Sequence, residues 1–333
     1  MHRHEGSRAR LTTIVAALLV CLAAPQCSKA PTEPTPGGGG NPTVPGPTAP
    51  APTLPVPNPG PETFVGAGDI AMCSGSNQPA GRQEDTARLL DTIGGTVFTV
   101  GDNAYPNGSR ENYQNCYNRT WGRHAGRTRP APGNHEYNMM SGAAPYFDYF
   151  GDLAGPRGLG YYSYDLGAWK VISLNSNDTE PGSGVSVAAG SPQGQWLQRE
   201  LAQNRSKCTL AYWHHPLFTS GQNGQNPRMQ AFFQMLYDAN ADVVLSGHDH
   251  LYERFAPQTA DGRLDLARGL RQFVVGTVGA TPLYHFVTVR PNSEAQNNRD
   301  HGVLRLTLNF DSYQWEFVTP SGTKDNGGPI PCH

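Results

Sequence analysis

Hydrophobic and polar positions form short blocks along the chain, and their spacing predicts both strands and helices. Apolar runs bounded by polar residues or glycine predict strands at 63–68, 96–101, 161–166, 169–175, 207–213, 242–247, 271–279 and within 302–319. Apolar residues at helical spacing predict helices at 82–93, 193–203 and 227–240. Strands alternate with helices early and dominate late. The pattern therefore predicts an α/β fold, an α+β sandwich of two stacked mixed β-sheets flanked by helices.

The first residues of the chain depart from this pattern. Arginines precede a short apolar run at 11–24 that ends in small residues, which is typical of an export signal. We interpret residues 1–27 as a signal peptide, with a buried N-terminal helix as the alternative. Cleavage near Ala23 or Ala24 competes with lipid attachment at Cys27, although Gln26 makes a poor lipoprotein signal.

The next segment, residues 28–62, contains 12 Pro and 6 Gly. Such a composition cannot bury enough apolar surface to offset the entropy of ordering, so we predict a disordered, mostly extended linker. At about 3.1 Å per residue, the linker would hold a domain up to about 100 Å from an anchor. The remaining residues, 63–333, suit one large domain.

Composition and charge exclude several classes of protein. The chain has 333 residues and a formal net charge of −2, which gives no electrostatic reason to expect a nucleic-acid partner. With 39 Gly and 29 Pro, the composition argues against a helical bundle. No apolar run reaches the roughly 18 residues that a membrane span needs.

Cysteines after the signal occur at positions 73, 116, 208 and 332. In an exported chain they allow two disulfides in three pairings. We favour Cys73–Cys116 and Cys208–Cys332, since the second pair would pin the C-terminal tail to a central strand. Free buried thiols are the alternative.

Side chains that can bind metal follow the apolar segments in order. They occur in the blocks Gly68-Asp69, Gly101-Asp102-Asn103-Ala104-Tyr105, Gly133-Asn134-His135-Glu136, His214-His215-Pro216 and Gly247-His248-Asp249-His250. Ligands collect at the carboxyl ends of strands in α/β sheets. Two cations about 3.5–4 Å apart can clamp the oxygens of a phosphoryl displacement, and the two oxygens of one carboxylate can reach one ion each. A glycine before a ligand lets the backbone turn sharply.

These blocks resemble the signature of calcineurin-like metallophosphoesterases, and their detail resembles the purple acid phosphatase branch. Many members carry Asp-x-His in the first block, but Ala71 stands at that position here. The purple branch has instead a tyrosine three residues after the bridging aspartate, and Tyr105 has that spacing from Asp102. The resemblance covers roughly residues 63–320.

The resemblance implies two metal ions and their ligands. The first ion would be bound by Asp69, Asp102, Tyr105 and His250, and the second by Asp102, Asn134, His214 and His248. Family members hold Fe(III) in the first site and Fe(II), Zn or Mn in the second, and phenolate and carboxylate oxygens suit a hard trivalent ion. The family's His-x-Pro spacing selects His214 over His215 as the ligand.

Two other histidines are candidate catalytic residues. The resemblance implies that His135 contacts the phosphate and helps the leaving group, with a structural role as the alternative. His215 either lines the pocket or packs. Glu136 and Asp249 are expected to orient loops. Plant enzymes carry a further histidine after the His-x-Pro ligand, and none occurs in 219–226 here.

We therefore expect an enzyme, a hydrolase of the acid phosphatase type, that cleaves phosphate monoesters with a metal-bound hydroxide. A phosphodiesterase acting on nucleotides or phospholipid head groups has the same metal core, and a non-catalytic surface binding module is a third hypothesis. The expected partner is a small phosphoester substrate. The protein is expected to be secreted, periplasmic or on the cell surface, with a lipid tether as one form of anchoring.

Overall fold

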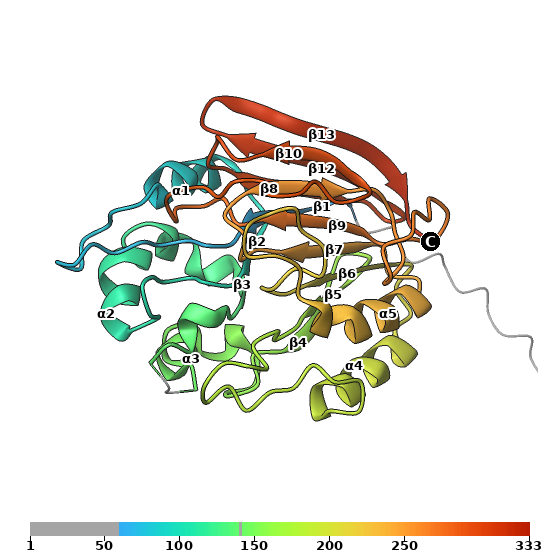
Figure 1. Ribbon diagram of the computed structural model, residues 1–333, viewed down its shortest axis with the longest axis horizontal. Helices are drawn as coiled ribbons and strands as arrows, with labels where there is room; N and C mark the ends of the chain where they lie inside the picture. Colours follow the sequence, from blue (N-terminus) through green and yellow to red (C-terminus); the bar gives the residue numbers. More distant parts are fainter. Residues whose placement is uncertain (1–59, 140–141) are drawn as a thin grey trace, which may run out of the picture. The chain divides into compact units, whose positions relative to one another are not determined.

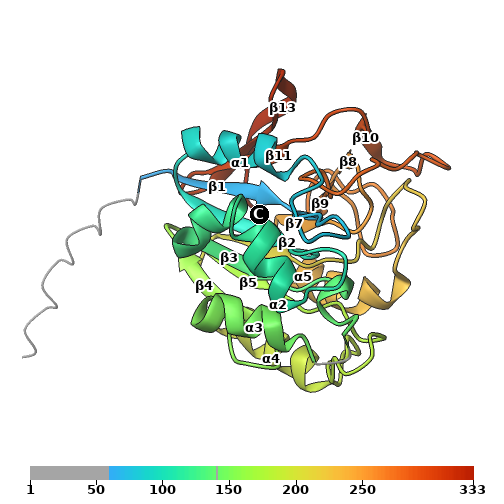
Figure 2. The ribbon, with the colours of Figure 1, turned by 90° about the vertical axis from the view of Figure 1, so that its left-hand side faces the viewer.

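Two mixed β-sheets pack face to face and carry helices on their outer faces, as Figures 1 and 2 show. The computed structural model describes residues 60–139 and 142–333. The first sheet has the order β13-β12-β11-β1-β2-β3 and the second the order β10-β8-β9-β7-β6-β5-β4. The predicted α/β sandwich is confirmed.

The element bounds are as follows. The strands are β1 (Glu62–Ala67), β2 (Thr96–Val100), β3 (Thr128–Ala131), β4 (Tyr162–Leu166), β5 (Trp169–Ser173), β6 (Cys208–Tyr212), β7 (Val243–Ser246), β8 (Tyr252–Phe255), β9 (Arg271–Val275), β10 (Ser293–Asn297), β11 (Val303–Leu308), β12 (Ser312–Thr319) and β13 (Gly322–Pro331). The helices are α1 (Gln83–Thr92), α2 (Arg110–Asn112), α3 (Ala144–Phe150), α4 (Pro192–Gln203) and α5 (Gln230–Asp238). Shorter helical segments are η1 (Tyr113–Tyr117), η2 (Trp121–Arg127), η3 (Asn134–Glu136), η4 (Gly151–Ala154) and η5 (Pro227–Met229).

The centre of each sheet is parallel. In the first sheet β2 pairs in parallel with β1 and β3, and in the second β5, β6, β7 and β9 run parallel. Antiparallel strands complete the edges. Because the chain leaves parallel neighbours at the same end, the loops after β1, β2 and β3 emerge together, as do those after β6 and β7.

The core lies on both faces of the second sheet. Leu245 and Phe273 face the first sheet, where Phe273 meets Trp315 with ring centroids 5.8 Å apart. Val244 and Val274 point the other way and pack in the cluster that includes α4 and α5. Burial on both faces explains why these strands read as continuous apolar runs.

Several expectations need adjustment. The predicted export signal and most of the predicted linker lie outside the described residues. Glu62, placed at the end of the linker, is instead the first residue of β1 and pairs with Leu308. The helix predicted at 227–240 begins as the 3₁₀ turn η5 before α5. Within the described ranges, no helix is long and apolar enough to cross a membrane.

Both predicted disulfides are confirmed. Cys73 pairs with Cys116, which joins the segment after β1 to η1. Cys208 pairs with Cys332 and ties the end of the chain to β6. The sequence separations are 43 and 124 residues, so each bridge restricts a long loop of the unfolded chain.

Removing either bridge is expected to lower the thermal midpoint by about 5–10 °C. A disulfide typically contributes about 2–4 kcal/mol, and about 1 kcal/mol shifts the midpoint of a domain this large by about 2–4 °C. The variants Cys73→Ala/Cys116→Ala and Cys208→Ala/Cys332→Ala would be compared with wild type by thermal circular dichroism. Four titratable thiols in the native, unreduced protein would contradict both pairings.

Candidate metal centre

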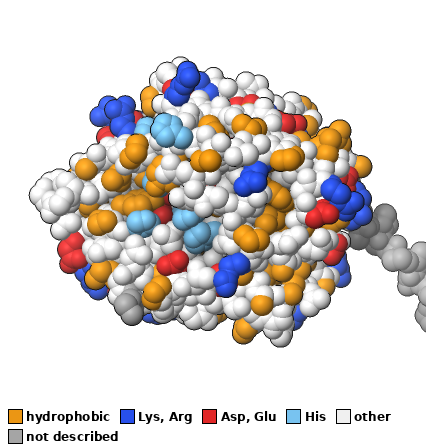
Figure 3. Space-filling model, viewed as in Figure 1, with side chains coloured by type: hydrophobic (Ala, Val, Ile, Leu, Met, Phe, Trp, Pro, Cys, Tyr) orange, Lys and Arg blue, Asp and Glu red, His pale blue; other side chains and the backbone are white. Residues whose placement is uncertain are grey.

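The carboxyl ends of parallel strands bring the predicted ligands together. Asp69, Asp102 and Asn134 follow β1, β2 and β3 of the first sheet. His214 and His248 follow β6 and β7 of the second, with His250 two residues further on. In Figure 3, histidine side chains reach the surface near the middle of the face shown.

The backbone at the ligands turns sharply, and the predicted glycine turn is confirmed at Gly101, whose φ is 92°. Asp69, Asp102 and His248 themselves adopt left-handed conformations, with φ of 60°, 49° and 69°. Non-glycine residues at such angles cluster at functional sites. Gly133, the glycine before Asn134, lets the Asp102 side chain lie close to the backbone, since a Cβ on Gly133 would collide with that side chain. The glycines thus provide room as well as turns.

One set of predicted ligands surrounds the hydroxyl of Tyr105. This oxygen lies 2.8 Å from Asp69 Oδ1, 2.9 Å from Asp102 Oδ2 and 3.1 Å from His250 Nε2. The Tyr105 N–H donates to the carbonyl of Ala71 at 2.9 Å. Tyr105 therefore stands directly beside the position where other members carry a histidine.

A second set surrounds His214 Nε2. This nitrogen lies 3.0 Å from Asn134 Oδ1, 3.2 Å from Asp102 Oδ2 and 3.2 Å from His248 Nδ1. His248 Nδ1 is also 3.1 Å from Asn134 Oδ1. The opposite nitrogen of His214, Nδ1, donates to the Val100 carbonyl at 2.7 Å, which fixes the tautomer that leaves Nε2 free for a ligand role.

Asp102 belongs to both sets through a single atom, Oδ2. Its other oxygen, Oδ1, accepts from the His135 N–H at 2.9 Å. The expectation that each oxygen faces one ion is therefore wrong for this conformation. The backbone amide occupies Oδ1 and turns Oδ2 toward both ligand sets.

The donor set fits two bound cations. Ligand atoms about 2.0–2.2 Å from one ion lie about 3–3.5 Å from each other, and the contacts above have that spacing. The set around Tyr105 has three oxygens and one imidazole, which suits a hard ion, whereas the set around His214 has two imidazoles. All the predicted ligands meet in one place, and their role as ligands stays a prediction.

The charges of the site are strongly coupled. Burial alone would raise the pKa of Asp102, but the charges of His214 and His135 outweigh it and hold that pKa well below its usual value. Burial lowers the pKa of His214, but Asp102 outweighs it and raises that pKa to about 9. Burial and the charges of Asp102 and Asp69 raise the pKa of Tyr105 well above its usual value. Loss of the tyrosine proton thus needs a strong positive charge nearby.

His135 lies at the edge of the set around Tyr105. Its Nδ1 donates to the Pro106 carbonyl at 2.5 Å, and its Nε2 is 3.8 Å from Asp102 Oδ2. Its ring packs on that of Tyr105, with centroids 4.3 Å apart. The ring is partly exposed, so it borders both the candidate metal centre and solvent.

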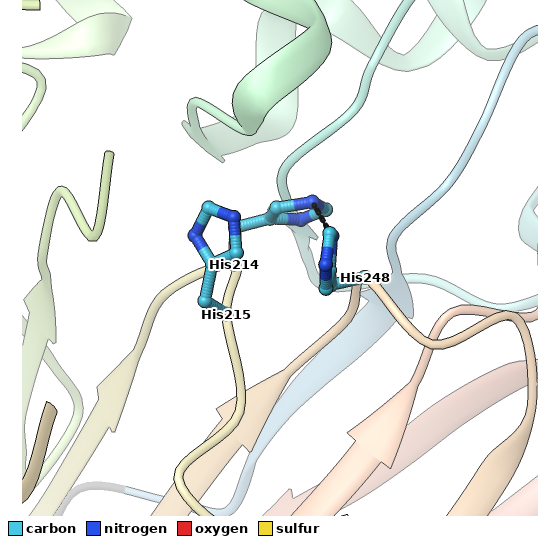
Figure 4. Close-up of side chains that lie close together, drawn as sticks. All are labelled: His214, His215 and His248. Atoms are coloured by element: carbon cyan, nitrogen blue, oxygen red, sulfur yellow. Dashed lines mark hydrogen bonds between the residues drawn. The ribbon is translucent and has the colours of Figure 1, made fainter. Parts of the chain in front are cut away.

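His215 forms a three-ring cluster with His214 and His248, as Figure 4 shows. Its ring centroid lies 4.9 Å from that of His214 and 4.5 Å from that of His248. Burial and the charges of these two neighbours hold the pKa of His215 well below its usual value. His215 therefore lies against two of the predicted ligands, and its contact with a substrate stays a prediction.

Glu136 and Asp249 hold loops, in agreement with expectation. Glu136 is buried and accepts from the N–H groups of Gly133 and Asn103 at 2.7 and 2.9 Å. Burial, together with the charge of Asp102, raises its pKa to about 7. Asp249 accepts from the Thr219 hydroxyl at 2.6 Å and the Asn223 N–H at 2.9 Å. The segment without the further histidine is thus tied to Asp249.

Sequence reasoning missed Tyr284. Its ring stacks on His250, with centroids 4.0 Å apart and an angle of 14° between the planes. Its N–H donates to the His250 carbonyl at 2.8 Å. Tyr284 lies in a loop after β9 that carries no motif, so a lone aromatic residue there gave no signal.

The fold and these side chains define an α/β sandwich protein with a candidate metal centre at its strand ends. This chain belongs to the calcineurin-like phosphoesterase family, whose sequence pattern matches residues 63–252. Several of its relatives are purple acid phosphatases, in keeping with the branch that the motifs resemble.

Two curated relatives and one solved structure illustrate the similarity. Purple acid phosphatase 22 of Arabidopsis thaliana is 35% identical over 28% of this chain and 22% of its own. An acid phosphatase of Aspergillus ficuum is 37% identical over 38% of this chain and 22% of its own. A purple acid phosphatase from yellow lupin (Lupinus luteus) seeds shares the fold, with a TM-score of 0.65 and 20% identity over 80% of this chain and 53% of its own. The chain spans 22–39% of the length of the curated relatives it matches.

Proposed function

We propose that this protein is a two-metal phosphoesterase that hydrolyses phosphate monoesters. The observation that carries the proposal is the position of Asp102 Oδ2, 2.9 Å from the Tyr105 hydroxyl and 3.2 Å from His214 Nε2. A carboxylate that faces two adjacent ligand sets can hold two cations close together, as a two-metal phosphoesterase needs. A binding module would have no need of such a shared ligand.

We propose Fe(III) for the set that contains Tyr105, and Fe(II), Zn or Mn for the set that contains His214. The phenol and the two carboxylates supply hard oxygen donors to the first ion, and imidazoles suit the second. Bound together, the two ions would neutralise phosphate charge and lower the pKa of the attacking water.

The chain's own residues would orient the substrate beside these ligands. His135 donates from Nδ1 to Pro106, so its Nε2 edge is turned toward the site. A proton held at Nε2 could pass to the leaving oxygen, which would supply the acid that segment 219–226 lacks. His215, inside the three-ring cluster, would contact the phosphate.

The disulfides favour an oxidising compartment, which supports export. We propose that the protein acts outside the cytoplasm, secreted or tethered through its Pro/Gly-rich segment. The partner would be a small phosphoester, with no nucleic acid involved.

Purified protein with two metals per chain is expected to hydrolyse p-nitrophenyl phosphate with a higher kcat/KM than bis-p-nitrophenyl phosphate. A monoester leaves three phosphoryl oxygens free for contacts with two cations and the histidines, whereas a diester leaves two. The measurement combines metal analysis with steady-state kinetics on both compounds.

The Asp102→Ala variant, purified in the same way, controls for contaminating phosphatase. A higher kcat/KM for the diester would contradict the proposal and indicate a phosphodiesterase instead. A protein that holds two metals and hydrolyses neither compound would refute the proposed activity.

A further inference from the structure

Ser176 makes two hydrogen-bond contacts with His215. The His215 N–H donates to Ser176 Oγ at 3.0 Å, and the same oxygen lies 2.9 Å from His215 Nδ1. Ser176 is 1% exposed and lies in the loop that follows β5. His215 lies in the loop that follows β6, the parallel neighbour of β5. The contact joins residues 39 positions apart in sequence.

The hydrogen count at Ser176 Oγ selects one tautomer of His215. The oxygen already accepts from a backbone N–H, so its own proton needs an acceptor. Among the described residues, His215 Nδ1 is the acceptor within hydrogen-bond distance of this hydroxyl. This count favours Nδ1 as the acceptor, which would leave the ring proton of His215 on Nε2.

We infer that Ser176 is a positioning residue, which holds His215 in the Nε2–H tautomer so that this N–H donates to a phosphoryl oxygen of the substrate. The inference rests on the proposed function for the identity of the acceptor. The tautomer itself rests only on the contacts with Ser176.

The direction of Nε2 supports this role. With Nδ1 held by Ser176, the other edge of the ring lies on the side of His214 and His248, where Figure 4 shows the imidazoles facing one another. Trp213 Nε1–H donates to the His215 carbonyl at 2.8 Å and fixes its backbone. The ring is thus fixed before an anion arrives, and donors fixed in advance stabilise charge strongly.

The tautomer also separates the roles of the adjacent histidines. His214 donates from Nδ1 to Val100, so Nε2 is the nitrogen that would bind a metal ion once it has lost its proton. His215, with its proton on Nε2, presents a donor where His214 presents a lone pair. The hydrogen bond with Ser176 thus suits His215 to contact the phosphate, and the hydrogen bond to Val100 suits His214 to bind a metal ion.

Nuclear magnetic resonance of the zinc-loaded protein tests the tautomer directly, because zinc is diamagnetic. Protein labelled with ¹⁵N-histidine would give long-range ¹H–¹⁵N correlations, and the His215 signals would be those lost in His215→Gln. We expect a protonated Nε2 and an unprotonated Nδ1 in wild type. A protonated Nδ1, as expected if His215 donated to Ser176, would overturn the inference without any Ser176 variant.

Calorimetric titration with inorganic phosphate tests the consequence. Ser176→Ala is expected to bind phosphate about tenfold more weakly at unchanged metal content, since the ring loses the partner that orients its donor. Ser176→Thr keeps the hydroxyl and is expected to restore most of the affinity. Ser173→Ala, at a buried serine of β5, is the matched control and is expected to bind like wild type.

The outcomes distinguish the two proposals. Wild-type affinity in Ser176→Ala would overturn the positioning role. A wild-type protein with Nε2 protonated that binds metals but no phosphate would refute the proposed function and leave the tautomer assignment standing.

Discussion

Replacing Asp102 by alanine is expected to release both metal ions and to lower phosphoesterase activity by about a thousandfold or more. Asp102 Oδ2 is the one atom common to the set around Tyr105 and the set around His214. Removal of one fixed charge-stabilising donor costs an enzyme about 10²–10³-fold, and this change removes the support of two cations. Metal analysis and p-nitrophenyl phosphate kinetics on the purified variant measure both effects.

Asn134→Ala is the matched variant for one site. Asn134 Oδ1 contacts His214 and His248 and no member of the set around Tyr105. The Asn134→Ala variant should therefore lose mainly the second ion and keep the first. If Asp102→Ala retained two metals per chain with its fold intact, the shared-ligand assignment would be wrong.

The central strands were predictable because a strand that is buried on both faces consists of consecutive apolar residues. The edge strands β3 and β13 carry no such signal, whereas the edge strand β4 was predicted at 161–166. β3 is Thr-Arg-Pro-Ala, an edge strand that pairs with β2 alone among the described strands, and proline is tolerated at such an edge. β13 contains three glycines and two prolines and is largely exposed. It pairs with β12 through backbone hydrogen bonds, which leave little trace in side-chain pattern.

The residue types of the candidate metal centre were predictable for a different reason. Each ligand follows an apolar strand, so order along the chain reveals the cluster. The orientation of each ligand was not predictable, since it depends on contacts between distant segments. The Val100 carbonyl orients His214 from 114 residues away, and the His135 amide holds one oxygen of Asp102. Spacing along one chain cannot specify such contacts.

Tyr105→Phe is expected to abolish the colour of the iron-loaded, oxidised protein. The hydroxyl lies 2.8 Å from Asp69 Oδ1 and 2.9 Å from Asp102 Oδ2, and both carboxylates oppose loss of its proton. Only a strongly charged cation among these oxygens would favour the phenolate. A phenolate on ferric iron absorbs visible light by charge transfer, so the purified wild type should be coloured. Absorption spectra at matched iron content measure the loss.

The fold should survive this substitution, because the ring is buried and stays in place against His135. Tyr284→Phe is the matched control: its ring stacks on the ligand His250, 4.0 Å away, and its hydroxyl has no hydrogen bond to a predicted ligand among the described residues. We expect Tyr284→Phe to keep the colour. Loss of colour in Tyr284→Phe but not in Tyr105→Phe would show that the iron-bound phenolate is Tyr284, in the loop after β9. A colourless wild type with confirmed ferric iron would rule out a tyrosine ligand and leave Ala71 beside an open coordination position.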